Sequence, residues 1–173
     1  MNPSPATPRA LPTRLLSSSA FEPFGEVLDA SGPCDDLAND GAAQVFRDRA
    51  RVDVAAQGGR VRLNIVRASP CRLPLKIEMM ERHPLGSQAF VPLGGADWLV
   101  VAAPPGQLDP GKIVAFGARG NQGINYRRGV WHHPLIALDR ISDFVVIDRA
   151  GEGTNLDIER LAEPLLIEPL ARG

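Results

Sequence analysis

The chain has 173 residues, 44% of them hydrophobic, and its 19 lysines and arginines nearly balance its 20 aspartates and glutamates. This length predicts one domain whose core buries roughly 70% of the surface of the unfolded chain. The balanced charge offers no basic field to a nucleic-acid backbone or an anionic membrane, and the longest apolar run, residues 98–105, is too short to span a bilayer. We therefore expect neither nucleic acid nor a membrane as a partner.

The N-terminal segment and the cysteines suggest where the domain begins and where the protein resides. Residues 1–13 contain four prolines and no apolar segment typical of a signal peptide. We expect a disordered tail there and a single domain over residues 14–173. Cys34 and Cys71 are too few for a disulfide-stapled secreted domain and have no CxxC partner. They favour a cytoplasmic location and argue against a thiol nucleophile.

The secondary structure expected along the chain is mostly strand. Helix is expected around residues 19–22 and from Asn155 to Glu163, whereas residues 43–56 fit neither pattern. Residues 93–97 have the composition of a hairpin connection between two strands. Short or alternating apolar runs predict strands at residues 61–67, 75–79, 89–92, 98–102, 113–116 and 143–148. This pattern, with helix below about a fifth of the chain, favours an all-β jelly-roll or related barrel.

All three histidines lie in two proline-bounded segments about fifty residues apart, residues 81–88 and 123–134. Histidine titrates near neutral pH and is the commonest metal ligand in proteins. If the fold brings these segments together, they form one catalytic or metal-binding pocket. The alternative is that they are packed or surface histidines that cluster by chance.

Strand alternation indicates which side chains face the interior of such a barrel. A strand that starts at Leu75 places Glu81 and His83 on the same face as its apolar residues, so we expect both to be buried. The strand over residues 61–67 places Arg67 with its apolar residues in the same way. A buried arginine needs a carboxylate, which either a ligand or an internal Arg67–Glu81 ion pair would supply.

The second histidine segment is less regular. His132 and His133 must face opposite sides of an extended strand, so at most one points into a pocket. Alternation does not decide which, because Gly129 can mark a bulge. Asn125 and Tyr126 can offer hydrogen-bond donors to an anionic or hydroxylated substrate.

These segments resemble the signature blocks of the ureidoglycolate lyase family, formerly called ureidoglycolate hydrolases. The similarity covers about residues 15–160 and is carried by residues 81–93, 122–126 and 129–135, with further support from 21–27, 39–41 and 143–149. Two positions depart from the family pattern. Arg127 stands where some members have histidine, and Leu156 stands where some have cysteine.

The resemblance implies a cupin-type double-stranded β-helix (a jelly-roll barrel) with one or two short helices, so that residues 14–173 form a cupin-like catalytic domain. It also implies a homodimeric lyase of allantoin and purine catabolism that splits (S)-ureidoglycolate into glyoxylate and urea. The chemistry requires a base for the substrate hydroxyl and an acid for the departing nitrogen. His83 and His132 are the candidates, and Glu81 is placed to orient or stabilise one imidazole. The expected substrate-binding residues are Arg67 for the carboxylate, and Gln88, Asn125, Tyr126 and His133.

For a metal, the resemblance leaves room for a weakly bound divalent ion, with nickel as the first candidate, and for no organic cofactor. The expected ligands are His83, His132 and Gln88, a weaker set than three histidines.

One alternative function is a cupin-like module that binds a small carboxylate without turnover. Another is a cupin enzyme that acts on a sugar or a keto acid.

Overall fold

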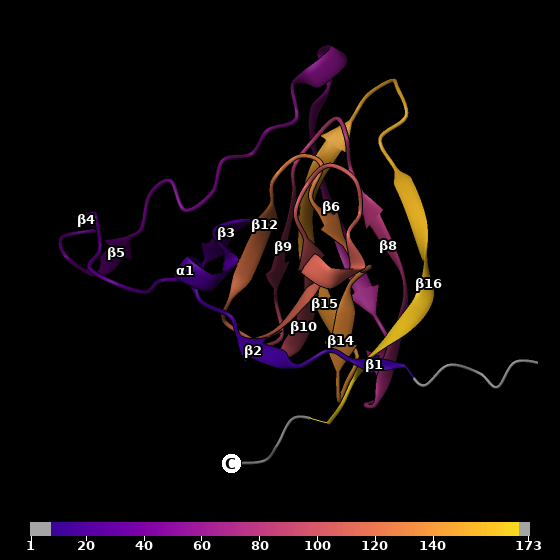
Figure 1. The fold of residues 1–173 in the computed structure, drawn as a ribbon. Helices are drawn as coiled ribbons and strands as arrows, with labels where there is room; N and C mark the ends of the chain where they lie inside the picture. The colour runs from indigo at the N-terminus through magenta and orange to yellow at the C-terminus, as the bar shows by residue number, and fades with distance from the viewer. Residues whose placement is uncertain (1–7, 170–173) are drawn as a thin grey trace, which may run out of the picture.

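The computed structural model describes residues 8–169 as two packed β-sheets and a small separate hairpin (Figure 1). Strand accounts for 49% of the described residues and helix for 6%, so the predicted all-β, cupin-like barrel is confirmed. Among the described residues, no helix is long and apolar enough to cross a membrane.

The larger sheet has nine strands. Seven of them follow the order β1-β16-β8-β13-β10-β11-β2, and β14 pairs with both β10 and β7. Its pairs are antiparallel except for three short ones, β1–β16, β2–β11 and β7–β14. The strands are β1 (Arg9–Ala10), β2 (Thr13–Leu15), β7 (Pro70–Cys71), β8 (Leu75–Arg82), β10 (Trp98–Ala103), β11 (Val114–Ala118), β13 (Trp131–His132), β14 (Ile136–Leu138) and β16 (Asp157–Ile167).

The smaller sheet is fully antiparallel and has the order β3-β12-β9-β15-β6. Its strands are β3 (Gly25–Leu28), β6 (Arg60–Ala68), β9 (Gln88–Pro92), β12 (Gly123–Tyr126) and β15 (Ser142–Ala150). A hairpin of β4 (Asp36–Ala38) and β5 (Ala43–Val45) projects away from both sheets (Figure 1). The helical turns are α1 (Ser18–Phe21), η1 (Ala56–Gly58) and η2 (Pro110–Lys112).

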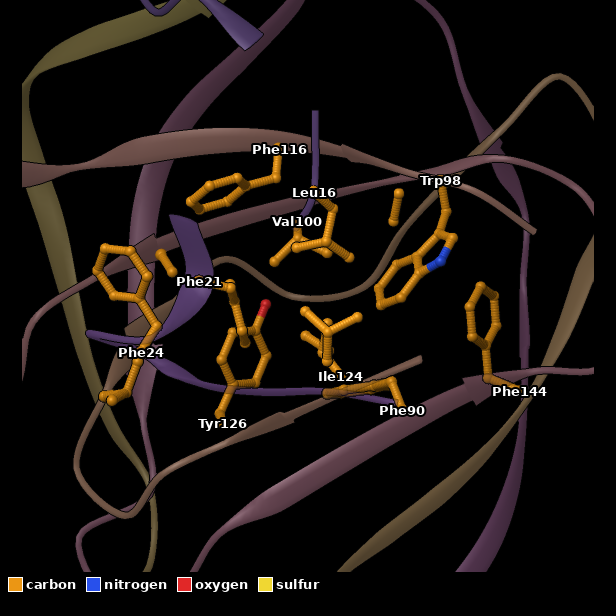
Figure 2. Close-up of a cluster of buried hydrophobic side chains, with 14 of the residues drawn as sticks. Leu16, Phe21, Phe24, Phe90, Trp98, Val100, Phe116, Ile124, Tyr126 and Phe144 are labelled. Atoms are coloured by element: carbon orange, nitrogen blue, oxygen red, sulfur yellow. The ribbon is translucent and has the colours of Figure 1, made fainter. Parts of the chain in front are cut away.

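An aromatic core joins the two sheets (Figure 2). Phe90 and Phe144 from the smaller sheet pack against Trp98 from the larger one, and the rings of Trp98 and Phe144 meet at 66° with centroids 5.1 Å apart. Tyr126 of β12 belongs to the same cluster. Edge-on contacts of this kind stabilise beyond the area that they bury.

Strand β10 is buried on both faces. Trp98 and Val100 face the core between the sheets, whereas Leu99 and Val101 belong to a second apolar cluster that includes Ile77 of β8. The histidine-bearing strand β13 pairs with β10, so it is held by a strand that is buried along its whole length.

Most predicted elements are present, but two are wrong. The six predicted strands occur as β6, β8, β9, β10, β11 and β15, and the predicted first helix occurs as α1. Residues 93–97 are not a hairpin, since they cross from β9 in the smaller sheet to β10 in the larger one. The segment from Asn155 to Glu163 is not helical, because β16 begins at Asp157. The pairing of β16 with β8 shifts register between Arg160 and Leu165, and this irregularity disguised the strand alternation.

Residues 9–13, which belong to the predicted disordered tail, are part of the fold. Strand β1 pairs with the end of β16, Leu11 is buried in the second apolar cluster, and β2 begins at Thr13. The prediction of disorder is therefore wrong for residues 9–13. Residues 1–7 lie outside the described part of the chain.

Phe144 offers a test of the core between the sheets. Phe144→Ala should lower the free energy of unfolding by about 3–5 kcal/mol, because it removes a fully buried ring and leaves a cavity against Trp98. Urea denaturation would measure this loss. Leu93→Ala, at an exposed position, is the control and should change stability by less than about 0.5 kcal/mol. Equal losses in the two variants would contradict this account of the core.

Candidate active site

The two-residue strand β13 brings the histidine segments together. His132 lies directly opposite Glu81 of β8 on one side and Ala102 of β10 on the other. In the turn before β13, Gly129 has a φ of +77° and its backbone N–H donates to the carbonyl of His83 at 3.0 Å. Glycine adopts this backbone conformation without strain, so the turn fastens β13 to the end of β8.

Glu81, His83 and His132 form one cluster. A ligand atom from each lies within 4.8 Å of those of the other two. The two imidazole rings have centroids 5.2 Å apart, and Nε2 of His132 lies 3.5 Å from Oε1 of Glu81. Both sequence segments therefore contribute to a single site, and His132 rather than His133 is the inward histidine.

Backbone carbonyls orient both imidazoles in the same sense. Nδ1 of His83 lies 2.7 Å from the carbonyl oxygen of Asn155, and Nδ1 of His132 lies 3.1 Å from that of Val130. A carbonyl oxygen only accepts, so each Nδ1 carries a proton and donates it. Nε2 of each ring is then left for chemistry, and in His83 it lies 3.2 Å from Oε1 of Gln88.

His132 is the most deeply buried member of the cluster. Its ring stacks on Tyr126 at 4.3 Å between centroids, with an interplanar angle of 15°. Burial lowers the pKa of His132 below the ordinary histidine value, and the nearby Glu81 carboxylate opposes that shift only in part. Its Nε2 is fully buried and makes no hydrogen bond with the described residues. The site thus holds a neutral imidazole whose free lone pair lies beside a carboxylate.

The same three side chains can hold a divalent metal. Two imidazole nitrogens and a carboxylate form a common ligand set, and histidine ligands usually donate their other N–H to a carbonyl, as both do here. The sequence prediction named Gln88 as the third ligand. In the structure Glu81 provides the carboxylate of the cluster, while the Gln88 amide contacts His83.

Three of the predicted substrate-binding residues lie outside the cluster or only support it. Asn125 faces away from Tyr126 on β12 and donates to Oε2 of Glu26 at 2.7 Å and to the carbonyl of Arg51 at 3.1 Å. His133 is half-buried, and its Nδ1 contacts the carbonyl of Pro134 at 2.8 Å. Tyr126 belongs to the aromatic core, where burial and the charge of Glu81 raise the pKa of its hydroxyl. Its ring stacks against one face of the His132 imidazole.

The structure does not place Arg67 in the site. Its side chain is 72% exposed, and Nε and Nη2 each donate to a carboxylate oxygen of Asp143 at 2.8 Å. The predicted Arg67–Glu81 ion pair is also wrong. Alternation correctly grouped Arg67 with Leu63 and Ile65, but β6 is an edge strand and that whole face is exposed.

A cavity of about 370 Å³ reaches the cluster at His83. Its lining includes Arg149 and the ion-paired Arg62 and Asp148, which the sequence analysis did not select. Leu156, one of the two departures from the family pattern, lines it as well. The other departure, Arg127, forms surface ion pairs with Glu22 and Glu26 at 3.3 and 3.0 Å.

Comparison with known proteins identifies the family. The model of the ureidoglycolate lyase family matches residues 8–168. A ureidoglycolate lyase from Burkholderia mallei (strain NCTC 10229) is 51% identical over 150 residues, which are 87% of this chain and 88% of the relative. Those from Rhizobium etli (strain CFN 42) and Brucella ovis are 46% and 49% identical, over 93% and 82% of this chain and 97% and 84% of the relatives. Because the match spans both histidine segments and both sheets, the chain belongs to the ureidoglycolate lyase family.

Proposed function

We propose that this protein cleaves (S)-ureidoglycolate to glyoxylate and urea in purine catabolism. The observation that carries this proposal is the cluster of Glu81, His83 and His132, in which both Nε2 atoms are free to act beside one carboxylate. The reaction is an elimination. The substrate hydroxyl loses a proton, the C–N bond breaks as the C=O bond forms, and the departing nitrogen gains a proton.

His132 is suited to be the base. Its Nδ1–H is held by Val130, and its lowered pKa keeps Nε2 unprotonated at neutral pH. When Nε2 takes the hydroxyl proton, the ring becomes an imidazolium with Glu81 at 3.5 Å. The carboxylate stabilises that cation in a region of low dielectric, where one opposite charge has a large effect.

His83 is suited to be the acid. Both atoms beside its ring nitrogens, the carbonyl oxygen of Asn155 and Oε1 of Gln88, are hydrogen-bond acceptors. Both oxygens can accept a hydrogen bond from the imidazolium, whose Nε2 proton is the one available to the departing nitrogen. The Gln88 amide lies next to this proton donor, where it can contact the ureido group of the substrate.

Glu81, His83 and His132 would hold a divalent ion if one binds, and nickel is our first candidate because imidazole nitrogens suit it. A bound ion would act as a Lewis acid towards substrate oxygen. His83 must then give up its Nε2 proton, so the metal-bound and doubly protonated forms of this ring exclude one another. We therefore propose that metal stimulates activity without being essential.

The activity itself is tested with racemic ureidoglycolate. The purified protein should release urea and glyoxylate in equal amounts and stop near half conversion, because one enantiomer is consumed. Colorimetric urea and coupled glyoxylate measurements would follow both products. A protein that binds the substrate without releasing either product would instead be the carboxylate-binding module.

Substitution of the two cluster histidines tests the assignment of acid and base. His132→Gln and His83→Gln should each lower kcat by about 10²–10⁴, the usual worth of a positioned acid or base, and added nickel should not restore it. His133→Gln, outside the cluster, is the matched control and should stay close to the parent. The parent should also stay active after chelation. Complete loss on chelation with full recovery on adding metal would make the metal essential.

We also propose a homodimer and a cytoplasmic location. In the smaller sheet β6 is an edge strand, and its Val61, Leu63 and Ile65 side chains are 54%, 64% and 58% exposed on one face. A row of apolar side chains along a free strand edge is suited to pairing with a second copy. The two cysteines are unpaired, which fits a reducing compartment.

Leu63 tests the proposed dimer surface. Leu63→Asp places a charge within the exposed apolar row and should convert dimers to monomers in sedimentation analysis without unfolding the barrel, since the side chain is outside both cores. Leu15→Asp, at an exposed position in β2 of the larger sheet, should leave the dimer intact. A parent that sediments as a monomer at micromolar concentration would contradict the proposal.

A further inference from the structure

Arg149, the penultimate residue of β15, lies in the cavity that reaches His83. The residue is only 3% exposed, although it carries a permanent charge. Charged side chains are rarely buried unless they are paired, because desolvation of an ion is costly. The groups that surround Arg149 therefore indicate the function of its charge.

Three glycines make room for this side chain. A methyl group at Gly59 or Gly86 would collide with the Arg149 side chain, and one at Gly151 would press on its guanidinium. Hydrogen bonds to backbone carbonyls hold the guanidinium in one orientation. Nε donates to the carbonyl of Ala56 at 3.0 Å, and Nη2 donates to the same carbonyl at 2.8 Å and to that of Glu152 at 2.9 Å.

These hydrogen bonds leave part of the guanidinium unused. No hydrogen bond within the described residues involves Nη1. Nor is Nη1 among the fully buried polar atoms that lack a partner, which in the described chain belong to Arg49, Asn125 and His132. Nη1 therefore keeps access to the cavity that Arg149 lines, and its two N–H groups are available to a ligand.

The charge of Arg149 is also uncompensated by the protein. Arg62, the other arginine of the cavity, donates through Nε and Nη2 to the two carboxylate oxygens of Asp148 at 2.8 and 3.0 Å. Arg149 forms no ion pair with a described carboxylate, and its partners are neutral carbonyls. The lining of the cavity thus carries a net positive charge, and the same cavity is lined by the candidate acid His83.

We propose that Arg149 binds the carboxylate of the substrate through Nη1, the role that sequence analysis had given to Arg67. This proposal rests on the function proposed above, since it names the group that holds the anionic end of ureidoglycolate while His83 and His132 act on the other end. The preset orientation of the guanidinium means that little conformational freedom is lost on binding.

The test compares a charged probe with its neutral counterpart by calorimetry. Oxalurate has a carbonyl in place of the reacting CH–OH group, so it carries the carboxylate and the ureido group but cannot be cleaved by this elimination. The parent should bind oxalurate about 10²-fold more tightly than the carboxamide of oxalurate, the usual scale for a charged hydrogen bond. Arg149→Met should remove this preference, and Arg149→Lys should restore part of it.

Arg67→Met is the matched control, since it removes an exposed arginine paired with Asp143 and should keep the full preference. An Arg149→Met protein that folds and still prefers oxalurate overturns the proposal and leaves Arg149 as a structural tie. If this variant does not fold, a crystal structure of the parent with oxalurate decides. The carboxylate must lie within hydrogen-bond distance of Nη1, and any other position contradicts the proposal.

These measurements do not depend on turnover. If the parent releases no urea but still shows a preference for oxalurate that requires Arg149, the proposed lyase activity fails while the carboxylate site stands. If the parent cleaves ureidoglycolate but Arg149→Met keeps its preference for oxalurate, the carboxylate site fails while the proposed lyase activity stands.

Discussion

The pairing of β13 with β8 fixes the geometry of the site. Strand β13 is two residues long, yet it places His132 opposite Glu81 and between two well-packed neighbours, β8 and β10. So short a strand contributes little stability by itself, and its position comes from the turn at Gly129 and from the double-sided burial of β10. The rigid core thus sets the distance between the two histidines to within the range that proton transfer or metal binding requires.

The backbone decides which nitrogen of each histidine is left for chemistry. The carbonyls of Asn155 and Val130 each occupy an Nδ1, so Nε2 of both rings is the nitrogen left to the cluster, and in His83 it also contacts Gln88. Two chemistries suit this arrangement, an acid–base pair and a metal site, and they differ in whether His83 keeps its Nε2 proton. The amide oxygen of Gln88 lies 3.2 Å from this nitrogen and can accept a hydrogen bond from it in the first case.

The sequence predicted the fold and the cluster better than it predicted the substrate contacts. Glu81, His83 and His132 were identifiable because they lie at the ends of strands whose neighbours are buried. Alternation in β8 is nevertheless not strict, since Ile77 and Met80 face the same cluster. Arg67 failed for a physical reason: alternation shows which residues share a face, but not whether another layer covers that face. Arg149 was missed because its setting is made by Gly59 and Gly86, which are distant in sequence and meet it only after folding.

Charge placement explains why the cation that binds the substrate should lie in a part of the site that Glu81 does not line. Ureidoglycolate is an anion, and a carboxylate beside Glu81 would be repelled strongly in a poorly solvated site. Arg149 lines the cavity at His83, whereas Glu81 pairs with His132 deeper in the barrel. A substrate that directs its carboxylate to Arg149 therefore separates the two negative charges, and its hydroxyl and ureido groups then face the histidines. The same arrangement that stabilises the anion would orient the reacting bond.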